Sequence, residues 1–212
     1  MASTYNPLNI ELEDHQGSTF ALFGASKSGK TTALLWLWRK YFQNHIPIIC
    51  SPNLHKSIYQ PILKRGIGTP YMAVLTDLLK SAWMAQKNTG NKYRFLIILD
   101  DVLVAKSSAI LRELILTFRN SDISTIISLQ GQTLLDKNNR SSVNYGLFFR
   151  YNSLEGSKDV VERFMGDLIE GRTLNEKSVN YESMMRDHHF IIRNNLTNEW
   201  ALTKIPKHLV EK

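Results

Sequence analysis

Three observations predict an α/β fold with a doubly wound, mostly parallel central sheet flanked by helices. Short apolar runs alternate along the chain with segments of helical periodicity, as in folds built from strand–helix–strand units. The run Phe95–Leu99 is apolar at every position, which is typical of a parallel strand covered on both faces. Polar motifs follow the ends of several apolar runs, where ligands bind in such sheets.

Length and composition describe one ordinary globular domain. The 212 residues suit a single domain with a core over about residues 18–150 and a small C-terminal helix and hairpin extension over 151–212. The net charge of +7 fits a polyanionic partner, usually nucleic acid, although a merely basic enzyme has the same balance. The single Cys50 excludes an internal disulfide and is expected to be a buried core thiol. We expect no signal peptide and no membrane span.

Apolar runs, or runs that alternate apolar and polar residues, predict the strands. They cover residues 8–12, 19–23, 46–50, 95–99, 123–129, 145–150, 190–193 and 200–203, and the last two are expected to form a hairpin. Helical spacing of apolar residues predicts the helices. These cover residues 30–44, 58–64, 71–87, 107–120 and 159–170, a helix or turn over 133–140, and a short helix over 181–186. Gly66, Gly68 and Pro70 are expected to break the chain.

The segment Gly24–Thr31 reads G-x-x-x-x-G-K-T between a strand and a helix, which is the context of a phosphate-binding P-loop. Its glycines let the backbone approach phosphate oxygens, and the amides of residues 26–31 can form an anion nest at a helix N-terminus. Lys30 is expected to reach the β- and γ-phosphates and Thr31 to offer its hydroxyl to Mg²⁺. The candidate nucleotide-binding residues are Gly24, Ala25, Ser26, Lys27, Ser28, Gly29, Lys30, Thr31 and Thr32. Lys27 either adds charge at the phosphates or faces solvent.

The second half of the expected nucleotide site follows two later strands. Phe95–Asp101 is a Walker B pattern, in which a buried strand delivers a carboxylate beside the Mg²⁺ held by the loop. Asp100 is expected to bind that Mg²⁺ directly or through water, and Asp101 to polarise or deprotonate the attacking water. Gln130 ends the next strand and is expected to contact the γ-phosphate or to orient the water. The alternatives are two solvated acids and an ordinary loop glutamine.

These motifs resemble the viral DNA-packaging ATPases of the poxvirus-like type, in the FtsK–HerA superfamily of P-loop motors. The resemblance rests on Gly24–Thr32, Leu96–Val102, the run Leu111–Gln130 and the later Arg140, and it covers about residues 18–150. It implies a P-loop NTPase fold and a sensor role for Gln130.

The resemblance also implies an arginine that reaches into a neighbouring subunit. Arg119 precedes the strand that ends at Gln130, where such motors place an arginine that stabilises charge on the γ-phosphoryl oxygens in trans. Arg140 is the second candidate for this role, or a phosphate sensor in cis. The chain departs from the family pattern at two positions, because Asn120 stands where histidine is common and Leu129 where threonine is commoner.

The function that the resemblance implies is a Mg²⁺-dependent ATPase that translocates double-stranded DNA into a viral capsid. It implies ATP and Mg²⁺ as cofactors, a homo-oligomeric ring of five or six subunits, and a viral capsid or vertex protein as partner. The expected location is the host cytoplasm or a virus factory, or the virion. Sequence-independent contacts to the DNA backbone require basic side chains, for which the candidates are Lys56, Lys64, Arg65, Lys137 and Arg140.

Two other functions stay open on the residues alone. The first is a P-loop nucleotide or nucleoside kinase, and the second is a nucleotide-binding structural protein with slow turnover. The acid pair Asp100-Asp101 and the strand-ending Gln130 favour hydrolysis over transfer to an acceptor.

Overall fold

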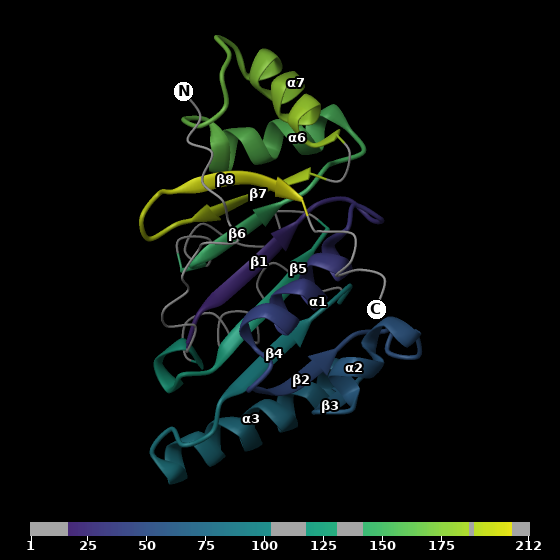
Figure 1. The fold of residues 1–212 in the computed structure, drawn as a ribbon, viewed down its shortest axis with the longest axis vertical. Helices are drawn as coiled ribbons and strands as arrows, with labels where there is room; N and C mark the ends of the chain where they lie inside the picture. The colour runs from purple at the N-terminus through teal and green to yellow at the C-terminus, as the bar shows by residue number, and fades with distance from the viewer. Residues whose placement is uncertain (1–16, 103–117, 131–141, 187–188, 205–212) are drawn as a thin grey trace.

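One eight-stranded sheet forms the centre of the molecule. The computed structural model describes residues 17–102, 118–130, 142–186 and 189–204. The strands are β1 (Thr19–Phe23), β2 (Ile46–Cys50), β3 (Ile67–Thr69), β4 (Phe95–Leu99), β5 (Ser124–Leu129), β6 (Tyr145–Phe148), β7 (His189–Asn194) and β8 (Trp200–Lys204). Their order across the sheet is β3-β2-β4-β5-β1-β6-β7-β8 (Figure 1). All pairs among β1 to β6 are parallel. β7 pairs antiparallel with β6 on one side and with β8 on the other. The predicted fold class is confirmed.

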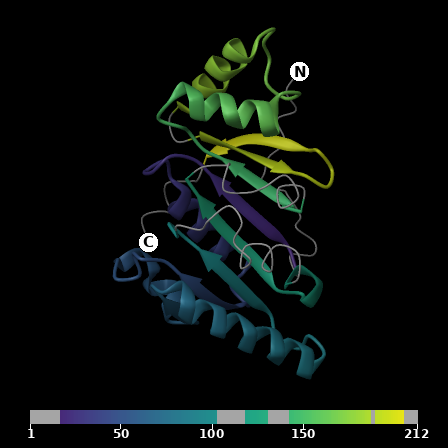
Figure 2. The ribbon, with the colours of Figure 1, turned by 180° about the vertical axis from the view of Figure 1, so that it is seen from behind.

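Helices lie on both faces of this sheet. They are α1 (Lys30–Tyr41), α2 (Gln60–Leu63), α3 (Met72–Thr89), α6 (Leu154–Val160) and α7 (Leu174–Met184), with the short 3-10 helices η2 (Ser57–Tyr59) and η4 (Phe118–Ser121) and a π-helical turn η6 (Val161–Met165). Figure 1 draws α1 in front of the sheet, whereas Figure 2, from behind, brings α3 to the front.

Alternation of side chains along each strand explains the two layers, because successive residues of a strand point to opposite faces. Phe20 and Leu22 of β1 belong to the same apolar cluster as the buried side chains of α1. Ala21 and Phe23 belong to a second cluster, which contains buried residues of α3, α6 and α7. The central strand β4 is therefore apolar at every position, as the sequence predicts, whereas β5 also buries Ser124, Thr125 and Ser128.

The β5 strand lies between β1 and β4 and pairs in parallel with both of them. The carboxyl ends of these three strands therefore meet at one edge of the sheet. Residues that follow β1, β5 and β4 lie side by side there although they are far apart in the sequence. This edge is where ligands bind in open α/β sheets.

The C-terminal extension continues the same sheet. β7 pairs antiparallel with β6, and β8 pairs with β7, so the predicted hairpin over residues 190–203 is present. Phe190 of β7 packs edge-on against Trp36 of α1, with ring centroids 6.3 Å apart. The extension thereby shares the core of the parallel strands.

Several predicted boundaries were wrong, and one strand was missed. β3 forms where the glycines and proline were expected only to break the chain. α6 begins at Leu154, five residues earlier than predicted, because Ser153 caps it, and its helical continuation ends at Met165. α7 begins at Leu174 rather than near Tyr181. The predicted strand over 8–12 and the predicted helix or turn over 133–140 lie outside the described residues. So do residues 107–117 of the helix predicted over 107–120, whose last three residues belong to η4.

Candidate active site

The segment Gly24–Thr32, named here the phosphate-loop segment, connects β1 to α1 at the carboxyl edge of the sheet. The amide of Gly24 donates to Leu129 O at 3.2 Å, and the amide of Ala25 donates to Arg150 O at 3.1 Å. A Cβ on Gly24 would lie 2.7 Å from Phe149 Cβ, so only glycine lets the loop pass this close to β6. The loop is thus fixed between the ends of β5 and β6.

The second glycine of the motif starts the helix. Gly29 has φ 104° and ψ 4°, a left-handed conformation that favours glycine, and α1 begins at the next residue. The amides of Lys30, Thr31 and Thr32 form the first helical turn, where no acceptor exists within the helix. They can therefore bind an anion at the positive end of α1. The amide of Ser28 differs from the expected nest, since it donates to Ala25 O at 3.3 Å.

Lys30 is the buried cation of this loop. Its side chain is only 4% exposed, and its Nζ donates to Gly24 O at 2.8 Å and to Ala25 O at 2.7 Å. Burial lowers the pKa of Lys30 below its usual value, and the charges of Asp101 and Asp100 partly oppose that shift. A phosphate anion would replace neutral carbonyl partners with a charged one, which stabilises the ammonium form. Lys27, by contrast, is exposed and has φ 62°.

Asp100 lies next to the loop and is fully buried. Its Oδ2 accepts hydrogen bonds from Thr31 Oγ1 at 2.9 Å and from the Tyr59 hydroxyl at 2.6 Å. Its Oδ1 is buried and has no hydrogen-bond partner among the residues that the structure describes. A buried carboxylate oxygen without a donor needs a cation or an ordered water, and Mg²⁺ binds one or two carboxylates together with phosphates and waters. Asp100 and Thr31 therefore fit a Mg²⁺ site.

Asp101 occupies a different environment from its neighbour. It is half-buried and has φ 55°, a strained value for a residue other than glycine, asparagine or aspartate. Asn53 Nδ2 donates to Asp101 Oδ2 at 3.3 Å, and Gln130 Nε2 donates to Asp101 Oδ1 at 3.4 Å. The structure thus brings together the acid and the amide that the sequence singled out. At 3.4 Å the carboxylate and the amide contact each other directly, so this contact must open before both can hold a water molecule.

Four polar residues around this site have no counterpart in the sequence prediction. Tyr59 contacts Asp100, Ser51 Oγ lies 3.5 Å from the Tyr59 hydroxyl, and Asn53 contacts Asp101. Burial and the nearby Asp100 raise the pKa of Tyr59 well above its usual value, so the phenol stays a proton donor. The exposed Arg150 follows β6 beside the loop. Ser51, Asn53 and Arg150 could have been identified as candidates from the sequence, because each lies at or just after the end of a predicted strand. No feature of the sequence points to Tyr59.

Arg119, the first candidate arginine, lies away from this cluster. Arg119 lies in η4, which precedes β5, whereas Gln130 follows β5, so the two lie at opposite edges of the sheet. The six residues of β5 separate these edges by roughly 20 Å at about 3.3 Å per residue. Arg140 and Lys137 lie outside the described residues. Lys56, Lys64 and Arg65 are exposed on the connection that follows β2, and Arg65 donates to Gln43 O at 2.7 Å.

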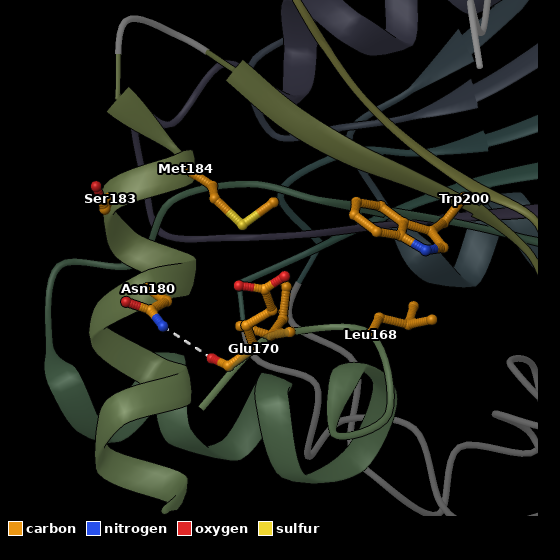
Figure 3. Close-up of a pocket in the computed structure, with 7 residues that line it drawn as sticks. Leu168, Glu170, Asn180, Ser183, Met184 and Trp200 are labelled. Carbon is orange, nitrogen blue, oxygen red and sulfur yellow. Dashed lines mark hydrogen bonds between the residues drawn. The ribbon is translucent and has the colours of Figure 1, made fainter. Parts of the chain in front are cut away.

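A cavity of about 510 Å³ lies elsewhere, between α7, the start of β8 and the chain around Glu170. Figure 3 shows Trp200, Met184 and Leu168 around it and the hydrogen bond from Asn180 to Glu170 O. None of the residues predicted for nucleotide or metal binding lines it. The candidate active site is therefore the polar cluster at the carboxyl edge of the sheet.

Known proteins share this fold without close sequence similarity. No protein-family model and no curated protein matches the chain. The DNA-packaging ATPase B204 of Sulfolobus turreted icosahedral virus has a TM-score of 0.66 at 14% identity over 91% of this chain and 100% of its own. The genome packaging NTPase B204 of Sulfolobus turreted icosahedral virus 2, in complex with AMPPCP, has a TM-score of 0.63 at 15% identity, covering 90% of this chain and 99% of its own.

A bacterial protein is also similar. EssC (ATPases 2 and 3) from Geobacillus thermodenitrificans has a TM-score of 0.62 at 11% identity, covering 90% of this chain and 40% of its own. At these identities the likeness establishes the fold, which is that of P-loop ATPases. Within the described part of the chain, no helix is long and apolar enough to cross a membrane.

Proposed function

We propose that this protein is a Mg²⁺-dependent ATPase that translocates double-stranded DNA into a viral capsid. The observation that carries the proposal is the convergence of the phosphate-loop segment, the pair Asp100-Asp101 and Gln130 at one edge of the sheet. The fold shared with the B204 packaging ATPases supports a packaging motor over the other kinds of P-loop enzyme.

Each residue then has a chemical role in hydrolysis. The first-turn amides of α1 and Lys30 bind the phosphates, and Thr31 and Asp100 hold the Mg²⁺, which neutralises charge on the phosphate oxygens. Asp101 accepts a proton from the attacking water or polarises it, and Gln130 orients that water. Asp101 must exchange its contact with Gln130 or Asn53 for the water, and both contacts are longer than 3.2 Å.

The motor would work as a homo-oligomeric ring of five or six subunits. The site described above contains no arginine from η4, and Arg119 lies at the far edge of its own sheet. An arginine in that place can complete the site of a neighbouring subunit, and Arg140 is the second candidate. The partners would be double-stranded DNA, held through its phosphate backbone, and a viral capsid or vertex protein. The expected location is the host cytoplasm, a virus factory or the virion.

The charge of the chain supports the choice of DNA. The net charge of +7 favours a polyanion, and Lys56 and Lys64 are exposed on the connection after β2. Such contacts predict binding that weakens steeply as the salt concentration rises. DNA would not raise the turnover rate of a P-loop kinase with the same fold, so stimulation by DNA distinguishes the two functions.

ATP hydrolysis with and without double-stranded DNA tests the proposal. We expect the DNA to stimulate phosphate release, and Lys30→Ala to reduce that release by about 10²-fold or more because it removes a cation from the developing charge. Lys80→Ala, a change of an exposed lysine on α3, is the matched control and should leave the rate unchanged. Transfer of phosphate to a nucleoside, without stimulation by DNA, would contradict the motor. Binding of ATP with negligible turnover under all conditions would favour a structural protein.

A further inference from the structure

The connection between β2 and β3 contacts both carboxylates at the end of β4. Tyr59 donates to Oδ2 of Asp100 at 2.6 Å from 41 positions away in the sequence, and Asn53 donates to Oδ2 of Asp101 at 3.3 Å from 48 positions away. Ser51 Oγ lies 3.5 Å from the Tyr59 hydroxyl and accepts the amide of Asn53 at 3.2 Å. The first residues of this connection thus form one hydrogen-bonded unit with the acids.

Tyr59 is held rigidly within this unit. Its side chain is 2% exposed and packs in the apolar cluster that contains Ile62 and the buried face of α1. The amide of Tyr59 donates to Lys56 O at 3.2 Å, which fixes the backbone of the 3-10 turn. Because the buried ring has little room to move, its hydroxyl stays within hydrogen-bond distance of Asp100.

The hydrogen bond from Tyr59 fixes the orientation of the Asp100 carboxylate. Oδ2 accepts two hydrogen bonds, from Tyr59 and Thr31, whereas Oδ1 is buried and none of the described residues donates to it. Rotation of the carboxylate about its bond to Cβ would break both hydrogen bonds. Groups that orient a metal ligand in this way commonly change metal affinity when they are removed.

We propose that Tyr59 is a positioning residue for the metal-binding acid, whose hydroxyl fixes Asp100 so that Oδ1 stays available to the Mg²⁺ that accompanies the nucleotide. The inference rests on the proposed function, because it takes Asp100 to be the acid that binds the metal. Tyr59 acts through Asp100 and needs no contact with the nucleotide.

Binding of a fluorescent ATP analogue to Tyr59→Phe, titrated with Mg²⁺, tests this role. We expect the affinity in EDTA to stay within about twofold of that of the unmodified chain, since the phosphate-loop segment is unaltered. The Mg²⁺ concentration that produces half of the Mg²⁺-dependent change in affinity for the analogue should rise about tenfold, because the carboxylate loses its orienting donor. Tyr145→Phe is the matched control: it removes a phenolic hydroxyl at the start of β6, at the opposite edge of the sheet, and should change neither value.

Two results of this titration would overturn the inference. One is an unchanged Mg²⁺ midpoint in Tyr59→Phe. The other is an equal loss of affinity with and without Mg²⁺, which would assign Tyr59 to the packing of the loop. A failure of the unmodified chain to bind the analogue would be a different result, because it would overturn the proposed function and this inference with it.

A second measurement keeps the hydroxyl and so does not depend on the stability of Tyr59→Phe. With 3-fluorotyrosine at position 59, the ¹⁹F resonance should shift when Mg²⁺ is added to the nucleotide-bound chain, because the charge on Asp100 is then shared with the metal. The same label at position 145 should not respond. A resonance at position 59 that is insensitive to Mg²⁺ would contradict the role of Tyr59.

Discussion

At the scale of single residues, the two adjacent acids have opposite environments. Asp100 is fully buried with two donors on one oxygen, whereas Asp101 is half-buried, has φ 55° and contacts two side-chain amides. This difference suits a division of labour, with the buried carboxylate at the metal and the accessible one at the water. The left-handed φ of Asp101 is one that glycine, asparagine and aspartate adopt more readily than other residues, so few residue types fit this position.

Asp101→Asn is expected to separate binding from hydrolysis. Asparagine tolerates the positive φ and keeps the shape of the side chain, so the fold and the nucleotide affinity should change little. Hydrolysis should fall about 10²- to 10⁴-fold, because the amide cannot accept a proton. Steady-state turnover and binding of an ATP analogue measure the two effects. Asp77→Asn, a change of an exposed acid on α3, is the control, and an undiminished rate in Asp101→Asn would refute the role of this acid.

Cys50 gives a prediction about pH. It is fully buried, and burial raises the pKa of its thiol to about 11. The folded chain therefore retains a proton that the unfolded chain loses from about pH 9, so this thiol stabilises the fold below pH 9 and its contribution is lost as the pH approaches 11. Urea titrations should show a smaller stability loss between these pH values in Cys50→Ala than in the unmodified chain. An equal loss in both proteins would contradict the pKa shift.

The residues of the candidate site differ in how far the sequence reveals them. Lys30 and Thr31 stand in a local motif, and Asp100 directly follows a recognisable strand. Tyr59 and Asn53 could not be found in this way, because their contacts with the acids depend on the parallel register of β2 and β4, in which Cys50 pairs with Leu99. That register is a property of the folded sheet.

At the scale of elements, the loop between β1 and α1 depends on close approach to β6. A Cβ on Gly24 would meet Phe149 Cβ at 2.7 Å and Ser28 Oγ at 2.8 Å. Neither β6 nor the loop can move away freely, because the amide of Ala25 is bonded to Arg150 O. The position of the phosphate-loop segment is therefore sensitive to a single methyl group.

Gly24→Ala is expected to displace this loop. The fold should lose about 1–3 kcal/mol of stability, as overpacked sites do, and the affinity for an ATP analogue should fall sharply. Gly90→Ala is the matched control, because Gly90 has φ 58° at the end of α3 and a Cβ there would meet no atom of the described residues within 4 Å. The change should cost about 1 kcal/mol and leave nucleotide binding intact. Thermal unfolding and a binding titration measure both variants. Normal binding in Gly24→Ala would contradict the close approach.

Element prediction succeeded where the pattern was continuous and failed where it was short. β2 and β4 match their predicted bounds because every position is apolar or buried by the two-sided core. β3 has only three residues, including Gly68, so it has no alternation to detect. The start of α7 was missed although Thr173 and Glu176 form a capping box, which is a local signal.

At the scale of the whole molecule, the candidate arginine and the acids lie at opposite edges of one sheet. This arrangement prevents Arg119 from completing its own site without a large rearrangement, and it is compatible with action on a neighbour in a ring. The resemblance to a motor family predicted this arginine, whereas the order of strands that separates it from the acids came from the structure.

Mixing two inactive variants tests action in trans. Arg119→Ala should reduce hydrolysis about 10³-fold or more, as removal of a trans arginine does, and Lys30→Ala should also be inactive. Mixed rings contain interfaces in which a Lys30→Ala subunit supplies Arg119 to an intact phosphate-loop segment. The mixture should therefore hydrolyse ATP faster than the sum of the two variants measured alone. A rate equal to that sum at every ratio would count against Arg119 and direct the same test to Arg140.

We propose above that ATP hydrolysis at this site moves the protein along DNA. Displacement of a third strand from triplex DNA measures such movement, because a protein that travels along the duplex strips the third strand ahead of it. We expect displacement that requires ATP and double-stranded DNA on at least one side of the triplex, and none with Lys30→Ala. The contradicting result is DNA-stimulated ATP hydrolysis without any displacement of the third strand, at concentrations at which the chain assembles on the duplex. It would show that hydrolysis does not move the protein along DNA.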